Sequence, residues 1–450
     1  MAKITLEQAA LWCGGRIDPK YKDVTFEGAN IDSRKLVPGQ LFVAIVAARD
    51  GHDFIPGALE KGAAAVLCSR QDGDFPAIVV EDTRIALGKI AAGFLQALGA
   101  KIIGVTGSVG KSTTKEMIAA VLQTSYRVSK TPANHNNDLG MPAAVLAMDA
   151  ESQIVVLEMG MSHFGEIEYL SRMAKPHVGV IINIGTMHIE NLGSQEGILQ
   201  AKLEITKGMD ENGKLFLYGD DPYLWGSRQK LPVKAEFFGA ANDKCQVLAE
   251  QVTENSEGIR FAVKTPQGTF PVYLPLEGQH YVSDALAAIS VGLHFGVTPE
   301  NIQKGLAAFQ TMEGRQEIFT YKDMTIIKDC YNAGPESMAA ALQVLGNRPG
   351  RKIAVLADML ELGSHSQDAH RKVGQLAAQK ADILLCYGKE SAAMQQGAVA
   401  AGMENAVHYM DQKQMASSLA ALAKPGDVLL FKGSRGMKME TVLELFVKDR

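Results

Sequence analysis

Residues 102–118, IIGVTGSVGKSTTKEMI, contain the feature that most restricts the fold of this chain. A β-branched run leads into a turn with glycines, and a lysine and several hydroxyl residues follow as a helical pattern begins. A strand, a glycine turn and a Lys-Ser pair that opens a helix are the parts of a phosphate-binding loop. Backbone N–H groups of such a turn, together with the positive end of the helix, bind phosphates. The segment therefore predicts an ATP or GTP site on an α/β domain.

The residues of this loop have separate expected tasks. Lys111 would reach the terminal phosphates, and Ser112 would place its hydroxyl on a magnesium ion. Val105 stands where the strict motif requires a glycine, five residues before Gly110. An ordinary glycine turn with a surface lysine is the alternative, and the buried-strand pattern before the turn argues against it. We expect the nucleotide to contact Gly107, Ser108, Gly110, Lys111, Ser112 and Thr113.

Composition bounds the number of domains and excludes some partners. A chain of 450 residues with 46% hydrophobic residues suggests about three domains at roughly 150 residues each. The net charge of −5 is spread over interspersed acidic and basic residues, so no broad basic face is expected for nucleic acid. No stretch is long enough to span a bilayer. The start reads as a short amphipathic helix capped by Thr5 rather than a signal peptide. Five cysteines without paired spacing argue against disulfides or a zinc site and favour the cytoplasm.

The order of patterns along the chain predicts its architecture. Short β-branched runs alternate with helical patterns, which is typical of α/β layers around mostly parallel sheets. Polar alternation between about residues 240 and 275 predicts hairpins attached to the central domain. A new series, MTIIKD, KIAVLAD, DILLCYG and DVLLFKGS, begins after residue 313. We expect an N-terminal α/β substrate domain (1–99), a central P-loop parallel-sheet ATPase domain (100–312) and a C-terminal Rossmann-like α/β domain (313–450).

Two further residues follow strand patterns. Glu158 ends the apolar run QIVVLEMGM, at the edge where open α/β sheets bind ligands. His188 follows another strand end, in VGVIINIGTMHIE. Taken alone, Glu158 is as compatible with a solvated loop position, and an isolated histidine is more often structural than a ligand.

The segment GILQAKLEITKGM contains an unusual lysine. Gln200, Glu204 and Lys207 form a polar stripe at helical spacing, whereas Lys202 lies off that stripe on the apolar side of the predicted helix. One interpretation is a lysine that extends its stem to water. The other is an amine that is modified or paired beside the nucleotide.

Motifs over nearly the whole chain resemble the Mur ligases, three-domain ATP-dependent enzymes that form amide bonds in peptidoglycan synthesis. They are DSRKLVPGQLFVAI and DGHDFI in the first domain, GVTGSVGKSTTKEM, KTPANHNNDLGMP, LEMGMSHFGEI and NIGTMHIENLGSQEGILQAKLEI in the second, and EGRQE, KDCYNAGPESM, DMLELG and FKGSRGMKME in the third. The third-domain set discriminates most and is similar to members that add D-alanyl-D-alanine. The chain departs from the family pattern at Ala47 and Ala133, where glycine is usual, and at Gly334, where asparagine is usual.

This resemblance implies roles for individual residues. Catalysis would involve Lys111, His188, Lys202 and Arg315, and Asp329 and Asn332 would help to hold ATP. Mg²⁺ would lie at Ser112, Glu158, His188 and Lys202, with Lys202 present as a carboxylated lysine. Substrate contacts would come from Ser33, Arg34, Asn134, Asn136 and Asn137, the first two toward the UDP part.

The expected activity is that of an ATP-dependent ligase acting through an acyl phosphate. It would join D-alanyl-D-alanine to the carboxylate of UDP-N-acetylmuramoyl-tripeptide in the cytoplasm. We expect a monomer with no nucleic-acid or membrane partner. The alternatives are another Mur-type ligase, either third-residue-adding or folylpolyglutamate type, or a regulator whose nucleotide site only controls conformation. The third residue of the tripeptide, lysine or diaminopimelate, stays open.

Overall fold

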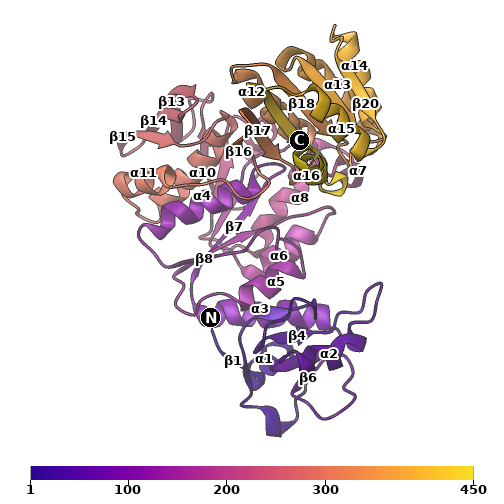
Figure 1. Ribbon diagram of the computed structural model, residues 1–450. Helices are drawn as coiled ribbons and strands as arrows, with labels where there is room; N and C mark the ends of the chain where they lie inside the picture. Colours follow the sequence, from indigo (N-terminus) through magenta and orange to yellow (C-terminus); the bar gives the residue numbers. More distant parts are fainter. Residues whose placement is uncertain (1, 449–450) are drawn as a thin grey trace.

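The computed structural model describes residues 2–448 and contains three larger β-sheets that follow one another along the chain. Figure 1 shows the N-terminal and C-terminal units at opposite ends, with the central unit between them. Each sheet lies within one of the three predicted domain ranges, and the α/β architecture is the predicted one. The exact domain bounds remain a prediction. No helix among residues 2–448 is long and apolar enough to cross a membrane.

The N-terminal unit contains a four-stranded parallel sheet in the order β3-β4-β5-β6 and a short antiparallel pair, β1-β2. Its elements are β1 (Ile4–Thr5), α1 (Leu6–Cys13), η1 (Pro19–Tyr21), β2 (Thr25–Phe26), β3 (Ala29–Asn30), β4 (Leu41–Val43), η2 (Gly51–Phe54), α2 (Ile55–Glu60), β5 (Ala65–Cys68), β6 (Ala77–Val79) and α3 (Thr83–Leu98). Thr5 caps α1 through a capping box with Gln8, as predicted. Helix α3 packs against α1 and also against the central unit, so one buried core joins the two units.

The central unit is built on a nine-stranded sheet in the order β15-β14-β13-β12-β11-β10-β7-β9-β8. Its elements are β7 (Lys101–Thr106), α4 (Lys111–Gln123), β8 (Val128–Lys130), α5 (Gly140–Leu146), β9 (Ile154–Glu158), α6 (Glu166–Ala174), β10 (Val178–Ile181), α7 (Ile189–Leu192), α8 (Gln195–Leu203), η3 (Glu204–Gly208), β11 (Lys214–Tyr218), α9 (Pro222–Ser227), β12 (Lys234–Gly239), β13 (Val247–Asn255), β14 (Gly258–Thr265), β15 (Gly268–Leu274), α10 (His280–His294) and α11 (Pro299–Ala307). Buried side chains of α4 and α10 cover one face, and those of α5, α6 and α8 cover the other.

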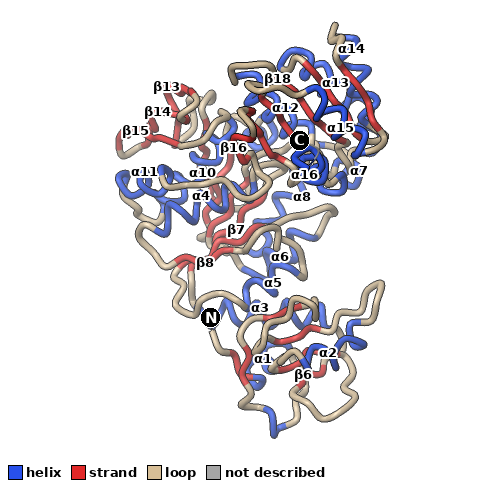
Figure 2. The backbone as a smooth tube through the Cα atoms, in the orientation of Figure 1, coloured by secondary structure: helices blue, strands red, loops and turns tan. Residues whose placement is uncertain are grey.

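Pairing within this sheet fixes where a ligand can bind. Strand β7 pairs in parallel with β10 on one side and with β9 on the other. The carboxyl end of β7 is therefore a topological switch point, where open α/β sheets bind their ligands. The predicted hairpins are confirmed: β13, β14 and β15 are antiparallel neighbours and project from the end of the sheet (Figure 2).

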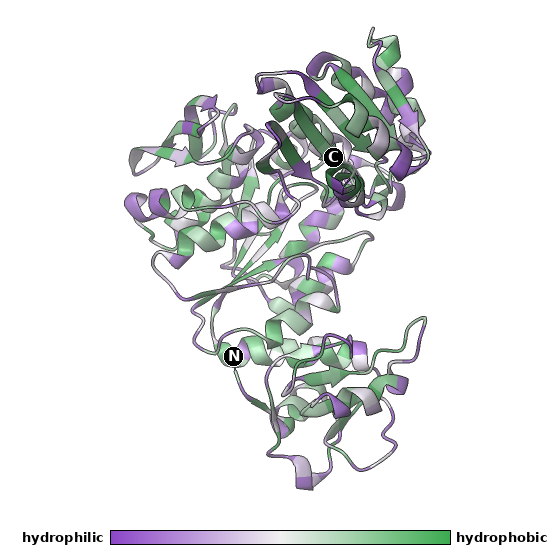
Figure 3. Cartoon of the chain, in the orientation of Figure 1, coloured by the Kyte–Doolittle hydropathy of each residue, from purple (hydrophilic) through white to green (hydrophobic). Residues whose placement is uncertain are grey.

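The C-terminal unit contains a six-stranded sheet in the order β16-β17-β21-β18-β19-β20, which is parallel except for β16. Its elements are β16 (Glu317–Tyr321), β17 (Met324–Asp329), α12 (Pro335–Asn347), β18 (Lys352–Ala357), η4 (Gly363–His365), α13 (Ser366–Lys380), β19 (Ile383–Tyr387), α14 (Ser391–Ala400), β20 (Ala406–Tyr409), α15 (Gln412–Leu422), β21 (Val428–Lys432), η5 (Arg435–Met437) and α16 (Met439–Lys448). The inner strands are hydrophobic (Figure 3) and buried on both faces. The edge strands β16 and β20 were not predicted, because their partly exposed residues give no clear strand pattern.

Candidate active site

The predicted phosphate loop lies at the switch point, between the end of β7 and the start of α4. Gly110 has a φ of 85°, and a Cβ there would lie 2.7 Å from Asp284 Oδ1, so only glycine fits. The side chain of Asn183, just after β10, accepts hydrogen bonds from the backbone N–H groups of Ser108 and Val109, both at 2.9 Å. The loop is thus fixed from two sides before any ligand binds.

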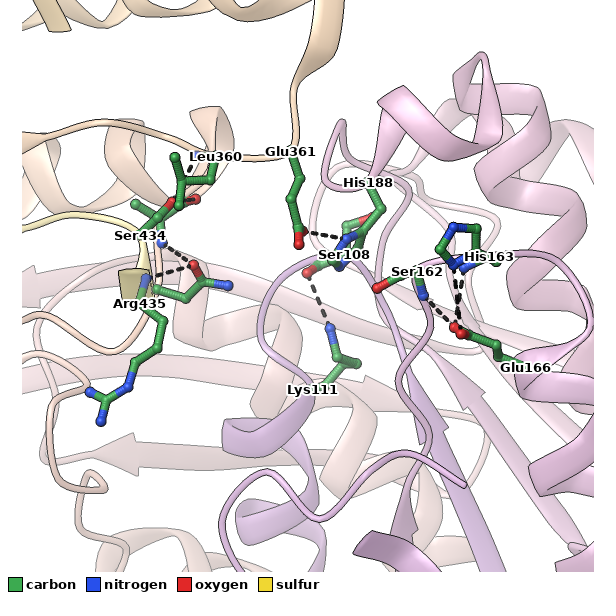
Figure 4. A network of polar contacts seen from close by, with 12 residues as sticks. Ser108, Lys111, Ser162, His163, Glu166, His188, Leu360, Glu361, Ser434 and Arg435 are labelled. Atoms are coloured by element: carbon green, nitrogen blue, oxygen red, sulfur yellow. Dashed lines mark hydrogen bonds and ion pairs between the residues drawn. The ribbon is translucent and has the colours of Figure 1, made fainter. Parts of the chain in front are cut away.

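Two cationic side chains meet at this loop. Lys111 Nζ donates to the carbonyl oxygens of Gly107 (2.9 Å) and Ser108 (3.3 Å), which holds the ammonium inside the turn (Figure 4). Burial lowers the pKa of Lys111 from its usual value. Arg315 reaches the same turn, since its Nη2 donates to Ser112 Oγ at 2.9 Å, and its guanidinium stacks 4.0 Å from the ring centre of Tyr331. The positive charges of Lys111 and Arg315 are therefore already in place to bind an oxyanion such as a polyphosphate.

A cavity of about 530 Å³ opens beside the loop and receives side chains from all three units. Most of the predicted site residues line it. They are Ser108, Gly110, Lys111, Ser112, Thr113, Asn134, Asn136, Asn137, Glu158, His188, Arg315, Asp329 and Asn332. Gly107, Lys202, Ser33 and Arg34 do not line it. Arg84, from the first turn of α3, is a lining residue that the sequence analysis does not identify.

Glu158 ends β9 as predicted and is 2% exposed. Its Oε1 accepts a hydrogen bond from Asn136 Nδ2 at 2.8 Å, whereas its Oε2 has no hydrogen-bond partner among the described residues. The fully buried Lys115, one turn after Lys111, lies 3.8 Å from Glu158 and donates to Thr131 O at 2.6 Å. This lysine therefore balances the buried carboxylate and holds the start of the loop that carries Asn134, Asn136 and Asn137. The sequence analysis does not identify it.

The residues present fit a magnesium ion that also binds phosphate. Within residues 2–448, no group of three or more His, Cys, Asp or Glu side chains is arranged to hold a metal ion by itself. Glu158 Oε2 is a buried oxygen without a hydrogen bond, and the Ser112 hydroxyl and His188 line the same cavity. Mg²⁺ commonly takes one or two protein carboxylates and completes its shell with water and substrate phosphates.

Lys202 is buried, with 2% exposure, in the last turn of α8. Among the described residues, no hydrogen-bond or ion-pair partner is recorded for its amine. Burial, together with the nearby charge of Lys111, holds the pKa of Lys202 well below its usual value. The 2% exposure argues against a lysine that extends its stem to water, and the lowered pKa shows that the surroundings disfavour a positive charge on the amine.

The predicted polar stripe beside Lys202 is partly wrong. Gln200 and Lys207 are exposed, but Glu204 is buried, with 9% exposure. The α-helix ends at Leu203 and a 3₁₀ turn begins at Glu204, which redirects this side chain inward. Its carboxylate accepts hydrogen bonds from the N–H groups of Gly165 (2.8 Å) and Glu168 (3.2 Å) at the start of α6. Glu204 is therefore an N-terminal helix cap rather than a surface residue.

The predicted nucleotide residues of the C-terminal unit lie next to a buried lysine. Asp329 Oδ2 pairs with Lys432 Nζ at 2.6 Å, and Lys432 also donates to Asn332 O at 3.0 Å. This unit contacts the central one nearby, because Glu336 Oε1 accepts from the Thr186 N–H (2.8 Å) and hydroxyl (2.9 Å). The two halves of the site are therefore connected directly.

The predicted substrate residues take different positions. Asn134 is exposed at the cavity, Asn136 is engaged with Glu158, and Asn137 Oδ1 accepts from the Gly140 N–H at 2.7 Å. Ser33 and Arg34 lie in a turn of the N-terminal unit, where the Arg34 guanidinium makes two 2.9 Å hydrogen bonds to Asp32. The structure does not bring Ser33 and Arg34 into the cavity, and their predicted contact with UDP remains untested.

Asp284, on α10, is expected to make stability depend on pH. Burial raises its pKa to about 7, from an ordinary value of 3.8, while it accepts a hydrogen bond from Thr114 Oγ1 at 2.6 Å. The folded chain then binds this proton more tightly than the unfolded chain, so the free energy of unfolding falls as the pH rises between these two values. Asp284→Asn keeps the acceptor oxygen and should stabilise the nucleotide-free protein at pH 8.5 by up to about 4 kcal/mol.

Thermal melts of both proteins at pH 5.5 and pH 8.5 test this effect. The advantage of Asp284→Asn should be larger at pH 8.5, since the wild-type carboxylate is then ionised in its buried position. An equal difference in melting temperature at the two pH values would contradict the assignment.

The fold and the site define a class: a three-unit α/β enzyme with a phosphate loop at the switch point of its central sheet. The chain belongs to the Mur ligase family. Residues 25–95 match the Mur ligase family catalytic domain, residues 105–292 the Mur ligase middle domain, and residues 314–435 the Mur ligase glutamate ligase domain. The family and the fold class predicted from the motifs are thus confirmed.

Individual relatives are similar over their full length. The UDP-N-acetylmuramoyl-tripeptide–D-alanyl-D-alanine ligase of Bacillus subtilis is 42% identical, over 100% of this chain and 99% of the relative. A crystal structure of MurF from Acinetobacter baumannii has a TM-score of 0.92 at 32% identity, covering 100% of this chain and 99% of the other. MurF from Thermotoga maritima in complex with ADP has a TM-score of 0.83 at 31% identity, with 94% and 97% covered.

Proposed function

We propose that this chain is an ATP-dependent ligase that joins D-alanyl-D-alanine to the terminal carboxylate of UDP-N-acetylmuramoyl-tripeptide in peptidoglycan precursor synthesis. The observation that carries the proposal is the hydrogen bond from Arg315 to Ser112. It places a guanidinium from the start of the predicted C-terminal domain directly against the phosphate loop of the central unit. The full-length similarity to a relative of that name supports the choice of substrates.

The chemistry follows from the weakness of a carboxylate as an electrophile. Attack of the tripeptide carboxylate on the γ-phosphorus of ATP releases ADP and gives an acyl phosphate. Lys111 and Arg315 neutralise the charge that moves through the phosphoryl group. The amine of D-alanyl-D-alanine then attacks the acyl carbon, phosphate leaves, and the ammonium proton is lost as the amide forms. Bound Mg²⁺ would add charge neutralisation at Ser112, Glu158 and His188.

An acyl phosphate hydrolyses, so the site must exclude water. Contacts between the central and C-terminal units support such enclosure. They include Arg315 with Ser112, Glu336 with Thr186, and the ion pair of Arg348 with Glu277. Asp329 and Asn332 lie on the C-terminal side of the same cavity, where we propose that they hold the nucleotide.

We also propose that Lys202 is carboxylated by CO2. An uncharged amine is the species that reacts with CO2, and the lowered pKa of Lys202 favours that form. The product is an anion with oxygen donors, which suits a hard cation such as Mg²⁺. The absence of any carboxylate partner for Lys202 among the described residues leaves room for this role.

Phosphate release measured with each substrate omitted in turn tests the proposed reaction. We expect rapid release only when ATP, UDP-N-acetylmuramoyl-tripeptide and D-alanyl-D-alanine are all present, together with one amide product detected by mass spectrometry. L-Alanyl-L-alanine serves as the matched control peptide. Both tripeptides, with lysine or diaminopimelate as the third residue, are compared because the chain leaves that choice open.

The same experiment separates the alternatives. A third-residue-adding ligase would use UDP-N-acetylmuramoyl-dipeptide and a free amino acid, and a folylpolyglutamate type would use a folate and glutamate. A regulator would bind ATP without forming any amide.

Steady ATP hydrolysis without either peptide substrate would reject the proposal. We propose a cytoplasmic location, because all five cysteines are described and free, as in a reducing compartment. We also propose that the chain acts as a monomer.

A further inference from the structure

Glu361, in the loop between β18 and η4, reaches from the C-terminal unit to His188 of the central unit (Figure 4). Its Oε2 lies 2.7 Å from His188 Nδ1, within ion-pair distance, but the ring N–H is not aligned with this oxygen as a hydrogen bond requires. Nδ1 makes no hydrogen bond in the part of the chain that the structure describes, and Glu361 is its ion-pair partner there. The motif DMLELG, which contains Glu361, has no task in the reaction as described so far.

The backbone on both sides of this contact is unusual. His188 has a φ of 64° and Glu361 a φ of 63°, and a side chain in this left-handed region costs on the order of 1 kcal/mol or more. Such conformations persist when the surroundings fix them. Here the two loops pack together, since a Cβ on Gly363 would lie 3.0 Å from Glu190 Cγ.

Glu361 is also presented by an anchored turn. The N–H of Leu360 donates to Ser434 Oγ at 2.9 Å, and the N–H of Ser434 donates to Asp358 O at 3.1 Å. Asp358, directly after β18, in turn accepts from the Ser391 N–H at 2.7 Å. These hydrogen bonds tie the turn that carries Glu361 to the sheet of the C-terminal unit. The position of the Glu361 carboxylate beside His188 therefore depends on that sheet.

We propose that Glu361 is a positioning residue for the metal site, acting through His188. A small rotation of the imidazole would align its Nδ1 proton with this carboxylate, which would leave the Nε2 lone pair free to face a cation. A carboxylate behind a ligand histidine fixes its tautomer and orientation in this way, and its loss commonly weakens metal binding 10- to 100-fold. Because Glu361 belongs to the C-terminal unit, the orientation of His188 depends on docking of that unit. The inference rests on the proposed function, in which His188 belongs to the magnesium site.

Binding of Mn²⁺, used as a paramagnetic probe for Mg²⁺, tests the proposal in the presence of a non-hydrolysable ATP analogue. Electron paramagnetic resonance titration should give a Mn²⁺ dissociation constant about 10-fold or more higher for Glu361→Ala than for wild type. Glu361→Gln keeps a neutral acceptor and should lie between the two. Glu404→Ala, an exposed glutamate of the same unit, is the matched control and should bind as wild type does.

A second measurement does not depend on metal. In ¹⁵N-histidine spectra, the His188 signal, assigned by its loss in His188→Gln, should report a proton on Nδ1 in wild type and a mixed tautomer in Glu361→Ala. Unchanged Mn²⁺ affinity in Glu361→Ala would overturn the positioning role. If His188→Gln also left Mn²⁺ binding unchanged, the metal role of His188 in the proposed function would fail as well, so the two failures are distinguishable.

Discussion

Lys202→Ala is expected to lower the rate of ligation by about 10³-fold while the chain stays folded, because it removes a preorganised charge from a site shielded from water. The wild-type amine is buried without a partner among the described residues, and its pKa is lowered by burial and by Lys111. A carbamate on this amine would oppose the positive charge of Lys111 and supply oxygen donors for Mg²⁺. The measurement is phosphate release with all substrates present.

Chemical rescue gives this prediction its specific test. Formate or acetate should restore part of the activity of Lys202→Ala, since a small carboxylate can occupy the space of the missing carbamate. Lys202→Arg should stay inactive, because a guanidinium keeps its positive charge and cannot react with CO2 to form a carboxylate. Wild-type activity in Lys202→Arg would show that the carbamate has no role. A melting temperature close to that of wild type is the control for folding.

Lys111→Ala is expected to reduce kcat/KM by about 10²- to 10³-fold, equivalent to roughly 3 to 4 kcal/mol of transition-state stabilisation. In the structure its ammonium donates to Gly107 O and Ser108 O, so it is already held within the phosphate loop. Initial rates over a range of ATP concentrations give the effect on kcat and KM separately.

Lys101→Ala is the matched control for this variant. Lys101 begins the same strand, at the opposite end from the loop, and its side chain is exposed. It should therefore leave the kinetics unchanged. If Lys111→Ala turned over as wild type does, the phosphate-loop interpretation of residues 102–118 would be wrong.

The local parts of the fold were predictable because they depend on neighbours in the sequence. The turn after β7, the Thr5 capping box and the three hairpin strands β13 to β15 each follow from patterns within a few residues. Glu158 at the end of a strand was found for the same reason. Where a short-range pattern was misleading, as at Glu204, a change from α-helix to 3₁₀ turn redirected the side chain.

At two positions where the chain departs from the family pattern, the contacts around the residue explain which residue the position accepts. Ala133, where glycine is usual, has a φ of 42°, in the left-handed region that disfavours alanine. Lys115 Nζ lies 3.4 Å from Ala133 O, and this contact helps to hold the loop in place. At Gly334, a Cβ would lie 2.9 Å from Met187 Cγ, so the glycine allows the start of α12 to approach the central unit closely.

By itself, the sequence determined the class of fold, the phosphate loop and the family, because strand patterns, caps and the Gly-Lys-Ser turn are encoded over short distances. Only the tertiary structure decided which distant side chains meet. Arg315 lies 203 residues from Ser112, Glu336 lies 150 residues from Thr186, and Asp284 lies 170 residues from Thr114. Glu361 reaches His188 across the same interface. The pairs of Arg315, Glu336 and Glu361 depend on how the central and C-terminal units pack together, and the pair of Asp284 with Thr114 depends on how α10 packs against α4. Neither residue of a pair has a local pattern that names its partner.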